Sequence, residues 1–479
     1  FSSISRNRVI WKKVRPRGFS DGENLQSLGG HYFELATAFI QGCLQEKVQP
    51  TLVTNRGFAR QQATLFRAVG TSATNSQKLQ VRPTLSVKGL LRHSLGADGR
   101  ANAIRGLDGR TEERAASRAR LFGWLPWCLR GEHAAFRLIR QWTREIGSEI
   151  ERFAPGPQDQ IVMTTATDFH CLALACMLRR FPSRQRLNLH LLFHYPVWQG
   201  DDKQRSDLFG RQMAASLNEM RDHNVRLYAT TQPLARQMRS VAIPTLVLPY
   251  PIRPITHDSD DANHTNSQTE THRKRILFGG MLRAEKGIAS FRNLLATIHR
   301  RGMLKKQYQV SAMMQARQCR WLIPPSLRRE HPSLLATATS GNHWEGPLHL
   351  HLDHLESGEF QRWLGTGDIA VFLYDPERYK VRLSSVMLET MSRGVPCIVP
   401  DHCWLAEMVR QHSDRGPIGY VYQHPEEIPN LLADFADQCT HIQRNAASNA
   451  ERILKMHESA NVVRQMTRDL EDKELRQIE

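Results

Sequence analysis

The sequence predicts an α/β protein with two Rossmann-like lobes, each a doubly wound parallel sheet, which face each other across a cleft. First, short apolar runs alternate with longer helical patterns along the 479-residue chain, which is typical of parallel sheets covered by helices on both faces. Second, a polar segment at 257–268 interrupts this pattern and follows three closely spaced prolines. Third, a glycine-rich strand end comes directly after the polar segment.

The expected strands are β-branched or apolar runs of three to five residues, and amphipathic stretches lie between most of them. The expected strands lie at 51–54, 161–164, 189–193, 225–228, 245–248, 275–278, 308–311, 369–373 and 397–399. Helices are expected at 31–45 and 384–393. The only candidate for a strand before the first helix is the short run 8–11, which two lysines follow.

These elements predict the domain boundaries. A first lobe covers 1–253 and carries a basic insertion at about 56–150, which is rich in Arg and poor in strand signals. A polar linker at 254–273 precedes a second lobe at 274–440, and a charged helical tail follows at 441–479.

Composition narrows the class of protein. The chain has 65 Lys and Arg against 47 Asp and Glu, a net charge of +18, which favours an anionic partner: phosphate groups, an acidic membrane surface or nucleic acid. The charge does not choose among them. No apolar run is long enough to span a bilayer. The eight cysteines have no metal-ligand spacing, so we expect reduced thiols in a cytoplasmic protein. The chain starts at Phe1, and we expect a processed N-terminus or a fragment.

The strongest motif opens the second lobe at residues 276–287. A strand runs into Gly279 and Gly280, and Arg283 and Lys286 follow before a helix begins. Glycines let the backbone approach a ligand closely, and the two cations can donate charge-assisted hydrogen bonds to phosphate. A surface turn with two solvated cations is the alternative interpretation.

A second motif spans residues 374–399 and has the order strand, polar loop, serine-capped helix, Gly-x-Pro, strand. Ser384 or Ser385 can cap the helix, and the same helix end can hold a pyrophosphate. Glu389 lies about one turn inside and could accept hydrogen bonds from ribose hydroxyls. An ordinary βαβ unit with an exposed Glu389 is the alternative.

Together, the motifs over 275–410 resemble the nucleotide-sugar half of a retaining GT-B type glycosyltransferase of group 1, also called family 4. The block that begins at 368–371 and ends at 404–409 matches the order of that family. The resemblance implies that Arg283 and Lys286 hold the donor diphosphate and that Ser384 and Ser385 present backbone amides to it. The chain departs from the pattern at Val381, where the family has the first of two glutamates; Glu377 and Arg382 lie nearby.

The first lobe offers weaker candidates. Gly29, Gly30 and His31 resemble the Gly-Gly loop of the family's acceptor lobe. Asp168 and His170 follow one expected strand, and His194 follows the next, where α/β folds bind ligands. A buried or solvated histidine is the more common outcome for both.

Three further signals carry less weight. Asp258 and Asp260 mimic a metal-binding pair but lie in the polar linker, and the histidines at 349–354 fit a strand edge better than a zinc site. No metal is therefore expected, and the chain has no P-loop motif. The segment 121–142 mixes aromatic and cationic residues and could lie on an anionic membrane or pack as a core helix.

The sequence thus predicts a metal-independent glycosyltransferase of glycan synthesis without a bound cofactor, which moves a sugar from a nucleotide-diphosphate sugar to a glycan, lipid-linked or small-molecule acceptor. Retention of the anomeric configuration is implied by the resemblance alone. The predicted catalytic residues are Arg283, Lys286 and His31, the donor-binding residues are Gly279, Gly280, Arg382, Ser384, Ser385 and Glu389, and the acceptor-binding residues are Gly29, Gly30 and Asp168. Alternatives are an inactive relative that binds a polyanion or acidic glycan, and a nucleotide-sugar epimerase. Nucleic acid is not an expected partner.

Overall fold

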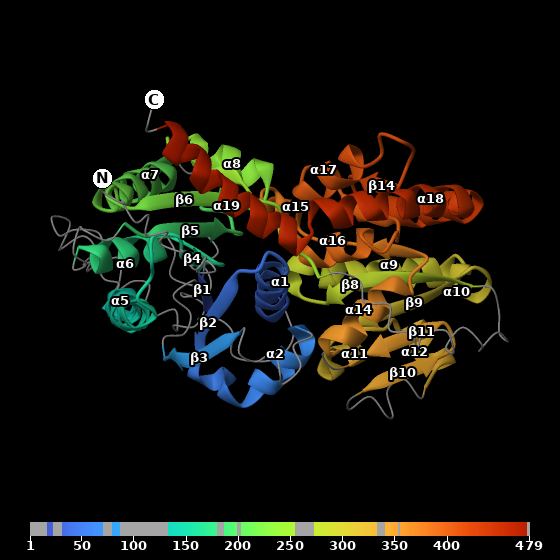
Figure 1. Ribbon diagram of the computed structural model, residues 1–479. Helices are drawn as coiled ribbons and strands as arrows, with labels where there is room; N and C mark the ends of the chain where they lie inside the picture. Colours follow the sequence, from blue (N-terminus) through green and yellow to red (C-terminus); the bar gives the residue numbers. More distant parts are fainter. Residues whose placement is uncertain are drawn as a thin grey trace, which may run out of the picture.

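The computed structural model describes residues 17–22, 31–69, 79–86, 133–179, 186–198, 203–253, 273–332, 341–352 and 355–476. They form two lobes side by side, each with a seven-stranded sheet and flanking helices (Figure 1). The predicted architecture of two doubly wound α/β lobes is therefore confirmed.

The first sheet has the order β3-β2-β1-β4-β5-β6-β7, and all its pairings are parallel. Every residue of β5 is buried, as expected for a central strand with helices on both faces. The strands are β1 (Arg17–Gly22), β2 (Gln49–Asn55), β3 (Gln80–Leu85), β4 (Gln160–Met163), β5 (Asn188–Phe193), β6 (Asn224–Ala229) and β7 (Leu246–Val247). The helices are α1 (His31–Gln45), α2 (Gln62–Val69), α5 (His133–Phe153), α6 (Asp168–Leu178), α7 (Lys203–Glu219) and α8 (Gln232–Arg239).

The strand before α1 differs from the expected one. The run 8–11 lies outside the described residues, and β1 occupies Arg17–Gly22 in the centre of the sheet, between β2 and β4. Its sequence, RGFSDG, has no β-branched residue. Its neighbours on both sides therefore fix it as a strand, and local propensity does not.

The second sheet has the order β10-β11-β9-β8-β12-β13-β14, in which only β10 runs antiparallel to its neighbour among the described pairings. The strands are β8 (Lys274–Met281), β9 (Tyr308–Met313), β10 (Asn342–Glu345), β11 (Leu348–His351), β12 (Ile369–Val371), β13 (Cys397–Pro400) and β14 (Gly419–Tyr422). The helices are α9 (Ile288–Arg300), α10 (Met303–Lys306), α11 (Ala316–Leu322), α12 (Pro325–Glu330), α14 (Ser357–Gly365), α15 (Pro376–Tyr379), α16 (Ser385–Met391), α17 (Trp404–Gln411), α18 (Ile428–Met456) and α19 (Ser459–Arg476).

The last helix returns to the first lobe. α18 runs along the second lobe, and α19 then packs against α1 (Figure 1). Val462 and Met466 of α19 share a buried cluster with Phe39 and Cys43 of α1. A Cβ at Gly42 would collide with the backbone of Ser459, so the two helices approach as closely as only glycine allows.

The core of the first lobe accounts for part of the segment that suggested membrane contact. Ile139 and Trp142 of α5 are 5% and 0% exposed and belong to the first-lobe core. The core interpretation therefore holds for these side chains, while 121–132 lie outside the described residues.

Within the part of the chain that the structure describes, no helix is long and apolar enough to cross a bilayer. None of the seven cysteines in that part forms a disulfide.

Candidate functional site

A pocket of about 400 Å³ opens between the two lobes. The first lobe contributes α1 and the loop after β5, and the second contributes the ends of β8 and β9 and the loop that leads into α16. In doubly wound sheets the carboxyl ends of the strands form the ligand site where the strand order reverses. In the second sheet this reversal lies between β8 and β12. The first predicted motif contains the end of β8, and the second begins shortly after β12.

The glycines at the end of β8 make room for neighbouring side chains. Gly279 packs so closely on Phe372 that a Cβ would collide with the ring, and its carbonyl accepts a hydrogen bond from the Tyr374 hydroxyl at 3.0 Å. Gly280 has a φ of +81°, and a Cβ there would lie 2.8 Å from Lys286 Nζ. The second glycine thus leaves space for the lysine, whereas the sequence predicts that the glycines let a ligand approach the backbone.

The two predicted phosphate-binding cations both line the pocket. Arg283 is exposed, while Lys286 is half-buried, with Nζ 5.1 Å from the centre of the Tyr374 ring. Burial lowers the pKa of Lys286, and Arg283 and Arg382 lower it further. An anion beside Lys286 would relieve this repulsion, so the arrangement suits a phosphate.

The loop between β12 and α16 carries Arg382 to the boundary between the lobes. Its guanidinium lies 4.7 Å from the ring centre of Tyr195 in the first lobe and 5.2 Å from that of Tyr379 in α15. Val381, at the position of the missing family glutamate, packs beside the first-lobe core, and its carbonyl accepts a hydrogen bond from Thr231 at 2.6 Å. Glu377 is exposed and does not line the pocket.

Ser384 and Ser385 begin α16 at the pocket wall. The Ser384 hydroxyl accepts the backbone N–H of Met387 at 3.2 Å, which confirms the predicted serine cap. Ser385 hydrogen-bonds Tyr250 of the first lobe. Both serines line the pocket.

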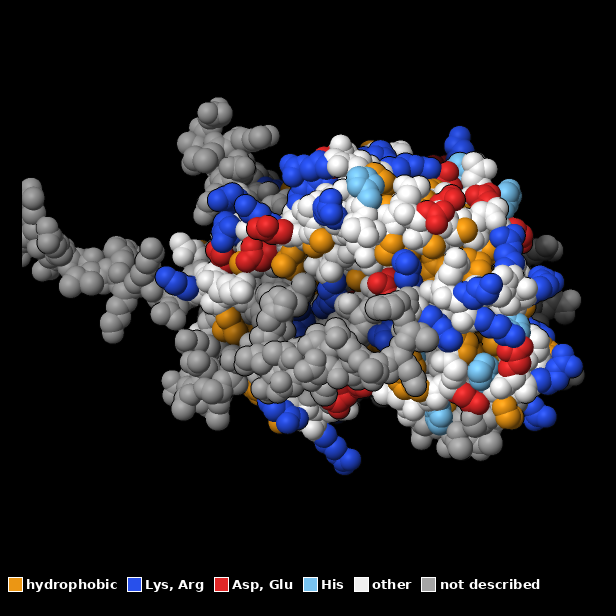
Figure 2. Space-filling model, turned by 90° about the vertical axis from the view of Figure 1, so that its right-hand side faces the viewer, with side chains coloured by type: hydrophobic (Ala, Val, Ile, Leu, Met, Phe, Trp, Pro, Cys, Tyr) orange, Lys and Arg blue, Asp and Glu red, His pale blue; other side chains and the backbone are white. Residues whose placement is uncertain are grey.

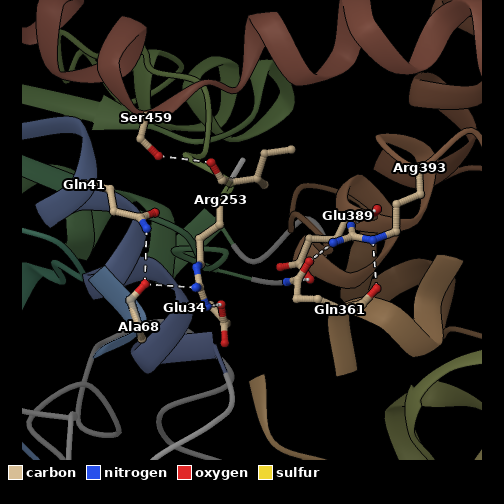
Figure 3. A network of polar contacts seen from close by, with 9 residues as sticks. Glu34, Gln41, Ala68, Arg253, Gln361, Glu389, Arg393 and Ser459 are labelled. Atoms are coloured by element: carbon tan, nitrogen blue, oxygen red, sulfur yellow. Dashed lines mark hydrogen bonds and ion pairs between the residues drawn. The ribbon is translucent and has the colours of Figure 1, made fainter. Parts of the chain in front are cut away.

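Glu389 lies 5% exposed on α16 and accepts a hydrogen bond from Gln361 at 2.7 Å. The Arg393 guanidinium binds Gln361 and donates to the Glu389 carbonyl at 2.5 Å (Figure 3). On the opposite side of the pocket, Glu34 of α1 pairs with Arg253 at 3.4 Å (Figure 3). Burial, with a contribution from Glu34, raises the pKa of Glu389 to about 8. The alternative of an exposed Glu389 is wrong.

The first-lobe candidates have mixed outcomes. Gly29 and Gly30 lie outside the described residues; His31 is the first residue of α1, and its side chain is also outside them. Asp168 starts α6, is 1% exposed and does not line the pocket.

The two candidate histidines of the first lobe are both buried. His170 caps α6 through Thr167, with 2.8 Å between its Nδ1 and the threonine hydroxyl. His194 lines the pocket and hydrogen-bonds the Thr164 carbonyl, and burial lowers its pKa to about 4. His194 is therefore neutral at physiological pH and can serve only as a neutral donor or acceptor there.

Not every pocket residue was singled out by the sequence analysis; among those missed are Tyr32, Glu34, Tyr195 and Tyr379. Tyr32 and Glu34 lie within one turn of the Gly-Gly loop, and Tyr195 follows His194 directly, so their positions next to predicted sites were the available signal. Tyr379 stacks against Tyr374 with ring centres 4.5 Å apart.

The histidines at 349–351 form strand β11, as expected. His349 stacks on Trp344 at 3.8 Å, and His351 lies 2.6 Å from the side-chain oxygen of Asn342. Burial lowers the pKa of His349 to about 3 and that of His351 to about 4. Within the described ranges no group of three or more His, Cys, Asp or Glu side chains is arranged to hold a metal ion. Residues 258, 260, 353 and 354 lie outside them.

Sequence comparisons found no family model and no curated protein that matches the chain. Solved structures match over nearly its whole length. The N-terminal domain of Candida albicans trehalose-6-phosphate phosphatase aligns with a TM-score of 0.60 and 10% identity, covering 95% of this chain and 97% of that one. Sucrose-phosphate synthase from Thermosynechococcus elongatus aligns with a TM-score of 0.56 and 12% identity, covering 97% and 99%. HepE from Anabaena, solved with UDP, aligns with a TM-score of 0.54 and 12% identity, covering 95% and 100%.

The chain has a GT-B fold. These alignments confirm the predicted fold resemblance. The sequence motifs lie in the second lobe, whereas each alignment covers both lobes. In the GT-B frame the pocket between the lobes is the place where the ligand-binding edges of both sheets meet.

Proposed function

We propose that this GT-B protein is a glycosyltransferase that moves a sugar from a nucleotide-diphosphate sugar to an acceptor. The observation that carries the proposal is the position of Lys286, which fills the space beside Gly280 within the interlobe pocket, with Arg283 at the same wall. A half-buried cation whose pKa is lowered by burial and by neighbouring cations gains most from an anionic ligand. A diphosphate supplies that anion.

The donor class is supported by the neighbours. HepE has been solved with UDP and with UDP-glucose, and a trehalose-6-phosphate synthase from E. coli with UDP-2-fluoroglucose. We infer the same class of ligand for this chain. Glu389 would then accept hydrogen bonds from ribose hydroxyls, and Gly280, Ser384 and Ser385 would let the diphosphate approach the backbone.

The chemistry follows from the charges. As the bond between the anomeric carbon and the phosphate oxygen breaks, the diphosphate takes the electron pair and gains negative charge. The acceptor oxygen forms the new bond to the anomeric carbon, and its proton leaves with the diphosphate. Arg283 and Lys286 stabilise this growing charge, an effect of about 3 kcal/mol per donor in well-measured enzymes. These cations supply the positive charge without a metal ion, and we infer from the resemblance that the configuration is retained.

The alternative is polyanion binding. On the coloured part of the face shown in Figure 2, Lys and Arg side chains lie among Asp and Glu and do not gather in one basic patch. Binding to a polyanion would weaken steeply between about 50 and about 200 mM salt. A sugar-nucleotide pocket would respond far less.

The test is a thermal-shift screen of the full chain with UDP, GDP, ADP and their sugars, followed by assay of sugar transfer with and without EDTA. A ligand that binds the native state raises its apparent stability by mass action. We expect one nucleoside diphosphate to raise Tm, EDTA to leave transfer unchanged, and the product to keep the donor's anomeric configuration by NMR. If none of the nucleotides binds, the proposal is wrong. Free sugar isomers formed without an acceptor would instead indicate the epimerase alternative.

The cytoplasmic location, contact with an anionic membrane and a role in glycan synthesis stay proposals. Membrane contact would have to use surfaces other than Ile139 and Trp142, because these side chains are in the core. Flotation of the full chain with vesicles that contain anionic lipid, compared with neutral vesicles, tests it.

A further inference from the structure

Three cations line one part of the interlobe pocket: Arg283, Lys286 and Arg382. They are close enough that Arg283 and Arg382 both contribute to the lowered pKa of Lys286, after burial. Arg382 also contributes to the lowered pKa of His194 in the first lobe, again after burial. The charge of Arg382 therefore acts across the boundary on the first lobe.

The acidic side chains of the pocket offset this charge only in part. Glu34 is ion-paired with Arg253 at 3.4 Å. The raised pKa of Glu389, about 8 through burial and the charge of Glu34, keeps this carboxyl largely neutral at pH 7. Glu285 is the third acidic residue that lines the pocket.

Lys286 and Arg382 hold neighbouring but distinct places. Lys286 lies against the ring of Tyr374 and Arg382 against the ring of Tyr379, and the two ring centres are 4.5 Å apart. The diphosphate of a nucleotide sugar carries one negative charge on each phosphate, which Arg283 and Lys286 can match. Arg382 is then a third cation in the pocket, and a ligand that carries only the two diphosphate charges has no further anionic group to place beside it.

The position of Arg382 indicates which part of a ligand it faces. Tyr195 belongs to the first lobe and Tyr379 to the second, and both rings lie near the guanidinium, at 4.7 and 5.2 Å. Such cation–π contacts use the faces of the guanidinium, whereas its N–H groups donate in its plane, in the forked geometry that suits carboxylate and phosphate. Arg382 thus stands at the boundary of the lobes, where donor sugar and acceptor meet if the proposed function holds.

We propose that Arg382 recognises an anionic group, a carboxylate or a phosphate, on one of the two sugars that react, in addition to the diphosphate held by Arg283 and Lys286. This inference rests on the proposed function and names the substrate class of the same pocket: an acidic sugar. The group can come from the donor, as a uronic acid, or from the acceptor, as a sugar phosphate. Arg382 is then a specificity residue that selects the charged substrate over its neutral analogue.

The experiment measures binding by calorimetry with the nucleoside diphosphate that binds tightest in the thermal-shift screen. The donor arm compares its glucuronate ester with its glucose ester. The acceptor arm compares glucose 6-phosphate with glucose in the presence of the diphosphate. We expect wild type to prefer the charged sugar by about 10-fold or more in one arm.

The same arms are repeated with Arg382→Ala, Arg382→Lys and the matched control Arg378→Ala. Arg378 lies in α15, pairs with Asp375 at 3.8 Å and does not line the pocket. Arg382→Ala should abolish the preference while the Kd of the diphosphate alone changes less than about 3-fold, Arg382→Lys should keep part of the preference, and Arg378→Ala all of it. Unchanged diphosphate binding also shows that the variants fold.

Two results would overturn the inference. One is a wild-type protein that binds the diphosphate but prefers the charged sugar in neither arm. The other is an Arg382→Ala variant that weakens binding of the diphosphate as much as Lys286→Ala does, because Arg382 would then be a third residue that binds the diphosphate. Absence of binding to every nucleoside diphosphate would overturn the proposed function itself, and this inference with it.

Discussion

Thr231 in the first lobe donates a hydrogen bond to the backbone carbonyl of Val381 in the second, with 2.6 Å between the oxygens. The same hydroxyl accepts the N–H of Leu234 at 3.2 Å and caps α8. One buried side chain therefore fixes both a helix end and the loop that carries Arg382.

Thr231→Val keeps the shape of the side chain but removes the hydroxyl, so both hydrogen bonds are lost. We expect a loss of about 1–2 kcal/mol in the free energy of unfolding, measured by urea denaturation. Thr231→Ser retains the hydroxyl and should stay close to wild type. A Thr231→Val variant as stable as wild type, together with a destabilised Thr231→Ser variant, would show that the methyl group, and not the hydroxyl, matters.

Gly280→Ala should weaken nucleotide binding. The residue has a φ of +81°, and the new Cβ would lie 2.8 Å from Lys286 Nζ, so the lysine must move. Gly302→Ala is the matched control, since Gly302 has a φ of +73° and nothing within 4 Å of a Cβ. Both variants should lose about 1 kcal/mol of stability from backbone strain. Only Gly280→Ala should raise the Kd for the diphosphate in calorimetry; the same Kd in both variants would contradict the arrangement.

Lys286→Ala should reduce the rate of sugar transfer about 10²- to 10³-fold, because the charge on the departing diphosphate loses a stabilising cation. Burial lowers the pKa of Lys286, which means that its charge opposes folding in the free protein. Tm should therefore stay unchanged or rise. Lys305→Ala serves as control, since Lys305 is exposed, pairs with Glu330 at 3.7 Å and does not line the pocket. A Lys286→Ala variant with wild-type rates would remove the site assignment.

Glu389→Gln should change how stability depends on pH. Burial and Glu34 raise the pKa of Glu389 to about 8 from an ordinary value of 4.5. Between these two pH values the folded state therefore holds a proton that the unfolded state has released. The contribution of the protonated carboxyl to the free energy of unfolding is complete below pH 4.5 and is lost as pH rises toward 8. The glutamine variant cannot ionise, so it should gain stability relative to wild type between pH 5 and about 8.5, measured by urea denaturation at each pH.

The exposed Glu426→Gln provides the baseline for that titration. Its stability relative to wild type should not change over the same pH range. Parallel pH profiles for wild type and Glu389→Gln would show that Glu389 is ionised in the folded protein.

The second-lobe residues of the site could be predicted from the sequence because they lie next to a strand and a helix along the chain. Gly280, Arg283 and Lys286 follow β8 directly, and Glu389 lies on the helix that Ser384 caps, so local spacing places them at one sheet edge. The alternation of apolar strands and helices likewise predicted both sheets.

The first-lobe half of the pocket was not predictable in the same way. Glu34 and Tyr195 become pocket residues only through the docking of one lobe on the other, which no local pattern encodes. β1 was not predicted because its own sequence lacks β-branched residues, and its pairing with β2 and β4 makes it a strand. Arg382 was assigned to the donor from its position in the loop, but its contact with Tyr195 depends on the tertiary fold.

The return of α19 to the first lobe has a mechanical consequence. The chain passes between the lobes near Ile252 and again near His457, and these two passages are bonded to each other: the Ile252 N–H donates to the His457 carbonyl at 2.9 Å, and the Ser459 hydroxyl to the Ile252 carbonyl at 3.0 Å. Because these two connections between the lobes are hydrogen-bonded to each other at one place, rotation about that place is the easiest relative movement of the lobes. Opening of the pocket to admit a nucleotide sugar would therefore be a rotation of the lobes about Ile252, His457 and Ser459.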